Sequence, residues 1–112
     1  GTDWDYELRL IDGESDDLIV GDLFPNPVTT DDPVQVRIFV VAPQTVYARI
    51  YNVLGQRVWS WEHEVSEPDD LTLYWYGRNS QRKAVSSGTY LMEIYGENRR
   101  FSRRLTLLRP SD

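Results

Sequence analysis

Apolar and polar residues alternate with a period of two through almost the whole chain, and this limits what it can fold into. The pattern is clearest in two stretches, Val34–Val40 and Val46–Tyr51. Successive side chains of an extended chain point to opposite faces, so this period gives each stretch one apolar face. No stretch shows the 3.6-residue period of a helix. The sequence therefore predicts an all-β protein.

The apolar faces also predict how the strands pack. Eight candidate strands follow one another with turn residues between them, as is typical of β-sandwiches. A single sheet would leave its apolar face in water, whereas two facing sheets bury the apolar faces of both. We therefore expect an antiparallel β-sandwich of about seven or eight strands. The candidate strands are Trp4–Leu10, Leu18–Val20, Val34–Val40, Val46–Tyr51, Arg57–Glu62, Leu71–Tyr76, Thr89–Tyr95 and Phe101–Leu108.

Turn residues predict which strands are joined by hairpins. Gly55 is free to adopt a positive φ and lies where the stretch Ile50–Trp61 must reverse, so a hairpin is expected there. A second hairpin is expected around Gly96–Asn98. The short turn Ala42–Gln44 predicts a third, between the strands Val34–Val40 and Val46–Tyr51.

Composition excludes several classes of protein. The 112 residues fit one domain, and 40% apolar with 27% charged residues is typical of globular domains. The absence of Cys excludes disulfides and Cys-based sites. No apolar run approaches the ~20 residues of a membrane helix. A net charge of −6 argues against non-specific binding to nucleic acid. Because Gly1 has no Met before it, we expect the chain to be a piece of a longer protein.

Few residues could carry catalysis or hold a metal. His63, the only histidine, lies between two glutamates, and an exposed position explains it better than a role as general base. Known nucleophile, phosphate-binding and zinc motifs are missing. The acidic loop from Asp12 to Asp17, followed by Asp22, could offer oxygen ligands to calcium, but its spacing does not match an EF-hand. We expect a non-enzymatic chain without a cofactor or metal.

Four aromatic residues are candidates for binding. Trp59 and Trp61 share one face of their strand, and Tyr74 and Tyr76 share one face of theirs. If exposed, such rings would form a flat platform for sugar rings or for an apolar partner. The alternative is that the tryptophans pack in the core or cover its edge, because Val58 gives that strand a second apolar face.

Arginines are the other candidates for binding. Five of them lie within residues 97–112, whereas residues 1–33 carry ten acidic residues and one arginine. Arg99, Arg100, Arg103 and Arg104 look like one basic cluster. Neighbours in a strand point to opposite faces, so Arg103 and Arg104 can share a patch only if a bulge intervenes. A bulge would also explain why Leu105, Leu107 and Leu108 do not fit one face. The alternative is separate surface arginines whose stems lie on apolar neighbours.

Four short motifs occur in an order that resembles a known family. They are Phe24–Pro27, Ile50–Val58, Trp75–Asn79 and Val85–Tyr90. Together they resemble the Ig-like C-terminal sorting domains of cargo of the bacterial type IX secretion system, and the related Ig-like domain of the flagellar hook-capping protein. The resemblance covers about residues 23–109. It implies an Ig-like sandwich in which Phe24–Pro27 leads into the domain and Tyr90 ties a strand corner.

The sequence departs from this family at two positions. Tyr76 stands where the family often has Asp, and Arg82 stands where it favours Gly. The turn Asn79–Lys83 must therefore differ, or it must place Asn79 in a left-handed conformation. We expect residues 1–22 to form a strand and an acidic linker packed on the sandwich, residues 23–109 to form the sandwich, and residues 110–112 to form a tail.

The resemblance implies a non-catalytic C-terminal module of an exported bacterial protein, found in the periplasm, at the cell surface or outside the cell. It would act in secretion, sorting or surface attachment by binding the secretion machinery or neighbouring domains. An exposed strand edge, or the segment Phe101–Arg109, would be the docking element. Two alternatives are a carbohydrate- or protein-binding accessory module of a surface enzyme, and a structural spacer between domains. No membrane insertion is expected.

Overall fold

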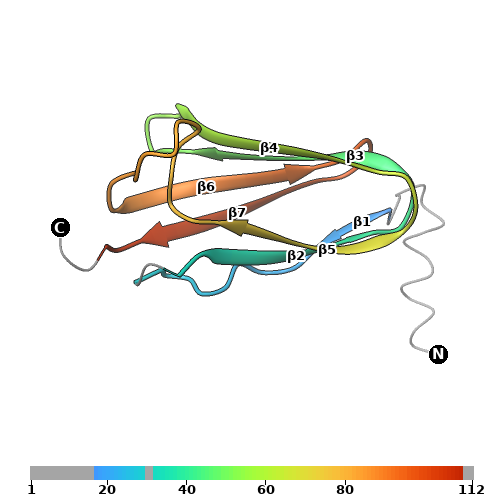
Figure 1. Ribbon diagram of the computed structural model, residues 1–112, viewed down its shortest axis with the longest axis horizontal. Coiled ribbons are helices and arrows are strands. Elements are labelled where there is room, and N and C mark those ends of the chain that lie inside the picture. Colours follow the sequence, from blue (N-terminus) through green and yellow to red (C-terminus); the bar gives the residue numbers. More distant parts are fainter. Residues whose placement is uncertain (1–16, 30–31, 110–112) are drawn as a thin grey trace.

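The computed structural model describes residues 17–29 and 32–109, which form two antiparallel sheets and no helix. The first sheet has the strand order β1-β2-β5 and the second has the order β4-β3-β6-β7. The two sheets lie one above the other in Figure 1. The seven strands are β1 (Leu18–Val20), β2 (Val34–Val40), β3 (Gln44–Tyr51), β4 (Arg57–Val65), β5 (Asp69–Trp75), β6 (Gly88–Tyr95) and β7 (Arg100–Leu107).

The predicted β-sandwich is therefore confirmed, with seven strands among the described residues. The predicted strand Trp4–Leu10 and the tail 110–112 lie outside the described residues. The strand β1 falls within the segment 1–22, and it pairs with β2 from Leu18↔Val40 to Val20↔Ile38. In the described residues there is no helix that is long and apolar enough to span a bilayer.

Alternating side chains build the core, as the period of two predicts. In β2 the residues Val34, Val36, Ile38 and Val40 are buried, and in β3 every second residue from Gln44 to Ile50 is buried. The other strands contribute their own inward residues, so apolar side chains of both sheets meet between the layers. This shared core holds the two sheets together.

The two expected hairpins at Gly55 and Gly96–Asn98 are confirmed, because β3 pairs with β4 and β6 pairs with β7. The expected hairpin between β2 and β3 is wrong. These strands lie in different sheets, and the turn at Ala42–Gln44 carries the chain from one layer to the other. Gln44 holds this crossing. Its buried Nε2 donates to the carbonyls of Asp17 and Ala42, and its Oε1 accepts from the Glu97 N–H.

No bulge interrupts β7. Its pairing with β6 runs without a shift from Gly88↔Leu107 to Tyr95↔Arg100, so the bulge that could have brought Arg103 and Arg104 together is absent from this strand. Leu105 and Leu107 are buried on the inner face. Leu108 follows the strand and is exposed, so the three leucines need no common face.

Specific side chains fix the turns. The Asn52 Oδ1 accepts hydrogen bonds from the N–H groups of Leu54 and Gln56, and Gly55 has a φ of 80°. The Tyr90 hydroxyl donates to the Ser86 carbonyl at 2.6 Å, which is the strand-corner bond that the resemblance implies. In the Asn79–Lys83 turn Arg82 adopts the left-handed conformation, with a φ of 69°, so the alternative of a left-handed Asn79 is wrong.

Candidate functional site

The four candidate arginines do not form one patch. Arg100 and Arg104 are exposed, and their cross-strand partners Tyr95 and Leu91 place them on the outer face of the four-stranded sheet. Arg99 and Arg103 instead lie near Phe101, with their guanidinium carbons 5.1 Å and 5.6 Å from the centre of its ring. This division follows the alternation of side chains along a strand.

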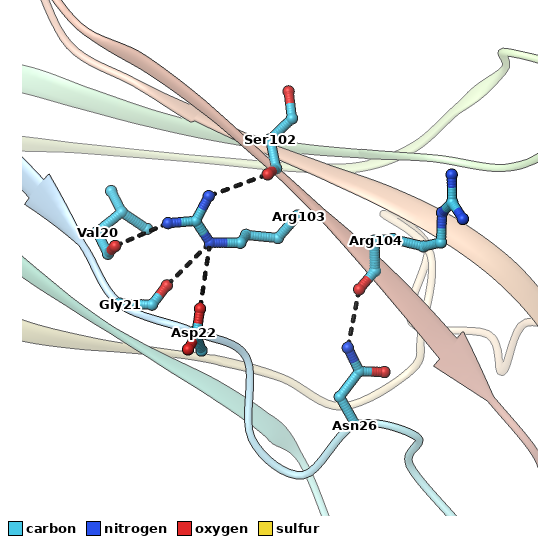
Figure 2. A network of polar contacts seen from close by, with 7 residues as sticks. All are labelled: Val20, Gly21, Asp22, Asn26, Ser102, Arg103 and Arg104. Carbon is cyan, nitrogen blue, oxygen red and sulfur yellow. Dashed lines mark hydrogen bonds and ion pairs between the residues drawn. The ribbon is translucent and has the colours of Figure 1, made fainter.

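Arg103 connects the two sheets. Its Nη2 donates to the Val20 carbonyl at 2.9 Å and its Nε donates to the Gly21 carbonyl at 3.1 Å. Its Nη1 donates to the carbonyl of Ser102, and Asp22 lies 3.9 Å away as a weak ionic partner. Figure 2 shows the guanidinium between the chain that follows β1 and its own strand β7. A planar fork with several donors suits this set of carbonyls, so the role of Arg103 is structural.

The outer edge of β7 is closed over Arg104–Leu108. The Asn26 side chain donates to the Arg104 carbonyl and accepts from the Thr106 N–H, as a strand would. Val28 continues this pairing, because its N–H donates to the Thr106 carbonyl and its carbonyl accepts from the Leu108 N–H. Asn26 approaches β7 from the side opposite to β6 (Figure 2). The expectation of a free docking edge is therefore wrong for this part of β7.

The outer face of the four-stranded sheet carries a polar aromatic cluster. The rings of Tyr47 and Tyr95 stack with their centres 5.1 Å apart. The guanidinium groups of Arg49 and Arg100 lie over the Tyr95 ring, and Arg100 forms an ion pair with Glu93 at 3.3 Å. The pKa of Arg49 is raised, chiefly by a hydrogen bond with the Tyr51 side chain. Glu93 lies near both arginines and offsets part of their positive charge.

The candidate tryptophans lie on the inner face of β4. Trp59 and Trp61 are paired with the buried residues Ile50 and Ala48 of β3, and both are half-buried against the core. The ring of Trp59 lies 6.4 Å from that of Trp75 in the opposite sheet. The Trp61 ring stacks on His63. The two indoles cover the edge of the core and do not form an exposed platform.

The candidate tyrosines are exposed. Tyr74 lies on the outer face of β5 with 47% of its surface accessible, and Tyr76 follows the strand with 59% accessible. Both line a depression of about 230 Å³ at the end of β5. The other lining residues are Trp59, Trp75, Arg78, Asn79 and Arg82. Three of the four candidate aromatics thus meet at one depression, together with two arginines that sequence reasoning missed.

The loop beside this depression is tightly held. The Asn79 Oδ1 accepts hydrogen bonds from the N–H groups of Gln81 and Lys83, and the Trp75 Nε1 donates to the Arg78 carbonyl. The Ser80 N–H donates to the Val58 carbonyl, which fixes the loop to β4. Such preorganisation lowers the entropy lost when a ligand binds.

Arg109 is a further residue that no sequence pattern selects. Its Nε donates to the Val85 carbonyl and its Nη2 donates to the Gly77 carbonyl. Its N–H donates to the Ser87 Oγ. Arg109 therefore fixes both ends of the loop between β5 and β6. No local pattern could have shown this, because 32 residues separate Arg109 from Gly77.

The outer face of the three-stranded sheet carries exposed apolar residues. Ile19 is 47% exposed and lies opposite Phe39, and Phe24, which is 67% exposed, lies opposite Gln35. Phe24 and Phe39 also line a depression of about 440 Å³. Beside Phe39, Arg37 and Asp70 form an ion pair with each other, and Asp22 also lines this depression.

The described residues offer little for catalysis or metal binding. In the ranges 17–29 and 32–109, no group of three or more His, Asp or Glu side chains could hold a metal ion. The acidic loop considered as a calcium site begins at Asp12, and most of it lies outside the described residues. His63 is exposed, and the ring stacked on it is that of Trp61.

The sequence matches no protein-family model and no curated protein. Solved structures nevertheless contain the same fold. The chain is similar to part of dimeric latent PorU from Porphyromonas gingivalis, with a TM-score of 0.63 and 18% identity over 85% of this chain and 10% of PorU. It is similar to part of PorZ from the same organism, with a TM-score of 0.55 and 20% identity over 84% of this chain and 12% of PorZ.

The flagellar hook-capping protein FlgD from Xanthomonas campestris also shares the fold, with a TM-score of 0.57 and 11% identity over 88% of this chain and 73% of FlgD. Of PorU and PorZ, in contrast, the chain spans only about a tenth of the length. The resemblance seen in the four motifs is confirmed as a likeness of fold: the chain has the Ig-like sandwich found in parts of PorU, PorZ and FlgD.

Proposed function

We propose that this chain is a non-catalytic recognition module of an exported bacterial protein, and that it serves secretion or surface attachment by binding another protein. The fold it shares with PorU and PorZ supports this proposal, because PorZ is described as a surface component of the type IX secretion system. The four motifs quoted above favour the same class of protein.

The exposed apolar face of the sheet β1-β2-β5 is the observation that carries the proposal. Ile19 and Phe39 lie side by side on this face, and Phe24 and Tyr74 lie on either side of Gln35. Contiguous apolar groups on a protein surface mark sites of protein–protein contact. The face therefore suits a protein partner that presents an apolar surface of its own.

A protein of the export machinery that presents an apolar surface fits this face better than a highly charged partner does. The two charges beside Phe39, on Arg37 and Asp70, neutralise each other. A face of low net charge binds mainly by burying apolar area, which supplies about 25 cal/mol per Å². We place the contact with the machinery on this face and assign Arg103 and Trp59 to the framework behind it.

A reporter fusion tests the proposal. Residues 1–112 are joined to the C-terminus of a periplasmic reporter in a bacterium that has a type IX secretion system. We expect the reporter to reach the cell surface or the medium. The same reporter joined to an unrelated β-sandwich of similar size should stay in the periplasm. Retention of both fusions would contradict the proposal and support a spacer role. Export of both would contradict it as well, because an unrelated β-sandwich would then serve equally well.

A further inference from the structure

We propose that the depression at the end of β5 binds an acidic saccharide, with Tyr74 and Tyr76 contacting the sugar and Arg78 and Arg82 contacting its acidic group. This site shares Tyr74 with the outer face of β1-β2-β5 but does not include Ile19, Phe24 or Phe39, so the inference does not rest on the proposed export role. The volume of about 230 Å³ lies below the usual range for drug-sized ligands and fits a ring-sized group.

The aromatic side chains supply the surface on which a sugar ring could lie. Tyr74 and Tyr76 are two residues apart, and both remain about half exposed, so their rings are accessible from solvent. The half-buried Trp59 and the buried Trp75 also line the depression. A tyrosine presents an apolar ring together with a hydroxyl, which matches a pyranose with its C–H face and its hydroxyl groups.

The two arginines supply an uncompensated positive charge. Arg78 donates from Nη1 to the Arg82 carbonyl, and both side chains line the depression. Among residues 17–29 and 32–109, no carboxylate forms an ion pair with either guanidinium. The loop segment 76–87 contains no acidic residue. A guanidinium binds a carboxylate or a phosphate through two parallel hydrogen bonds, so an acidic group on the sugar would complete the site.

The backbone at Arg82 is a separate observation that points to its side chain. With a φ of 69°, Arg82 lies in the left-handed region, where an L-residue is disfavoured by about 1–2 kcal/mol and glycine is not. The fold alone would be served better by glycine at this position. Strained residues of this kind are concentrated at functional sites. The guanidinium is therefore the reason that we assign for an arginine here.

Binding can be measured by following the indole N–H signal of Trp59 in an NMR titration of the full chain at low salt. Trigalacturonic acid is the acidic probe, and its fully methyl-esterified form is the matched neutral probe. We expect the acidic trimer to bind at millimolar or lower concentration, and the ester to bind at least about tenfold more weakly, because charge-assisted hydrogen bonds are lost.

Variants separate binding from folding. Arg82→Gly should weaken binding of the acidic trimer by about tenfold or more while the Tm changes little, because glycine adopts the required φ freely. Tyr76→Ala should also weaken binding. Arg100→Ala, which removes a cation from the opposite sheet, should leave binding unchanged.

Three results would overturn the inference. The first is absence of binding by the acidic trimer at millimolar concentration. The second is equal binding of the ester. The third is tighter binding of an acidic hexapeptide than of the trimer, because it would assign the site to a peptide.

Discussion

The Arg109 guanidinium fills the space in which a side chain at Gly77 would stand. A Cβ placed on Gly77 would lie 2.6 Å from Arg109 Nη2, and the same nitrogen donates to the Gly77 carbonyl. Gly77 also has a φ of 73°, which favours glycine. Arg109, which follows β7, and Gly77, at the start of the loop after β5, thus pack closely against each other.

Gly77→Ala should therefore destabilise the domain more than the same change at another turn. We expect the free energy of unfolding to fall by about 2 kcal/mol, because the left-handed conformation and the displaced hydrogen bond both contribute. Gly55→Ala is the matched control. It has a φ of 80°, but a Cβ there meets nothing within 4 Å, so a loss of about 1 kcal/mol is expected. Urea denaturation measures both, and equal losses would contradict the role of Arg109.

Asn26 should protect the edge of β7. Asn26→Ala removes the bonds to the Arg104 carbonyl and the Thr106 N–H, so we expect a loss of about 1 kcal/mol in stability and faster hydrogen exchange of the Thr106 amide. Asn26→Asp retains an acceptor and should keep part of the protection of Thr106. Unchanged exchange of Thr106 in the alanine variant would show that Asn26 does not close this edge.

Arg103 and Arg104 should behave differently although they are neighbours. Arg103→Ala removes bonds to the Val20 and Gly21 carbonyls and should lower the free energy of unfolding by about 1–2 kcal/mol, a range that allows for its partial exposure. Arg103→Lys should not restore this, because an ammonium lacks the planar fork. The exposed Arg104 should change stability by less than about 0.5 kcal/mol when replaced by alanine. Equal effects in thermal denaturation would refute this division.

The period of two in the sequence predicted most of the fold, because burial alternates along each strand. It identified the inward residues of β2 and of most of β3 correctly. The same pattern gives no information on which strand lies beside which, and the hairpin expected between β2 and β3 failed for this reason. Buried Gln44 holds the crossing from one sheet to the other through hydrogen bonds to backbone groups that are distant in the sequence. No local sequence pattern predicts these bonds.

The candidate site was predictable only in part. The sequence selected Tyr74 and Tyr76 from their spacing, and both prove to be exposed at one depression. It gave no signal for Arg78, and it marked Arg82 only as a departure from glycine. Their meeting with the tyrosines depends on how the loop after β5 folds back, which is set by contacts such as that of Arg109 with Gly77.

Contact with the export machinery through the outer face of β1-β2-β5 is the central claim, and the surface-exposed fraction of a reporter tests it most directly. The reporter is joined to residues 1–112 carrying Phe24→Ser with Phe39→Thr, or carrying Val53→Thr with Leu54→Ser as the control. The control pair is also exposed and apolar, but it lies at the tip of the β3–β4 turn.

Both fusions are first shown to unfold at similar temperatures. We predict that the Phe24/Phe39 variant stays in the periplasm while the Val53/Leu54 variant reaches the surface as the unaltered chain does. Export of the Phe24/Phe39 variant at the unaltered level would contradict the account.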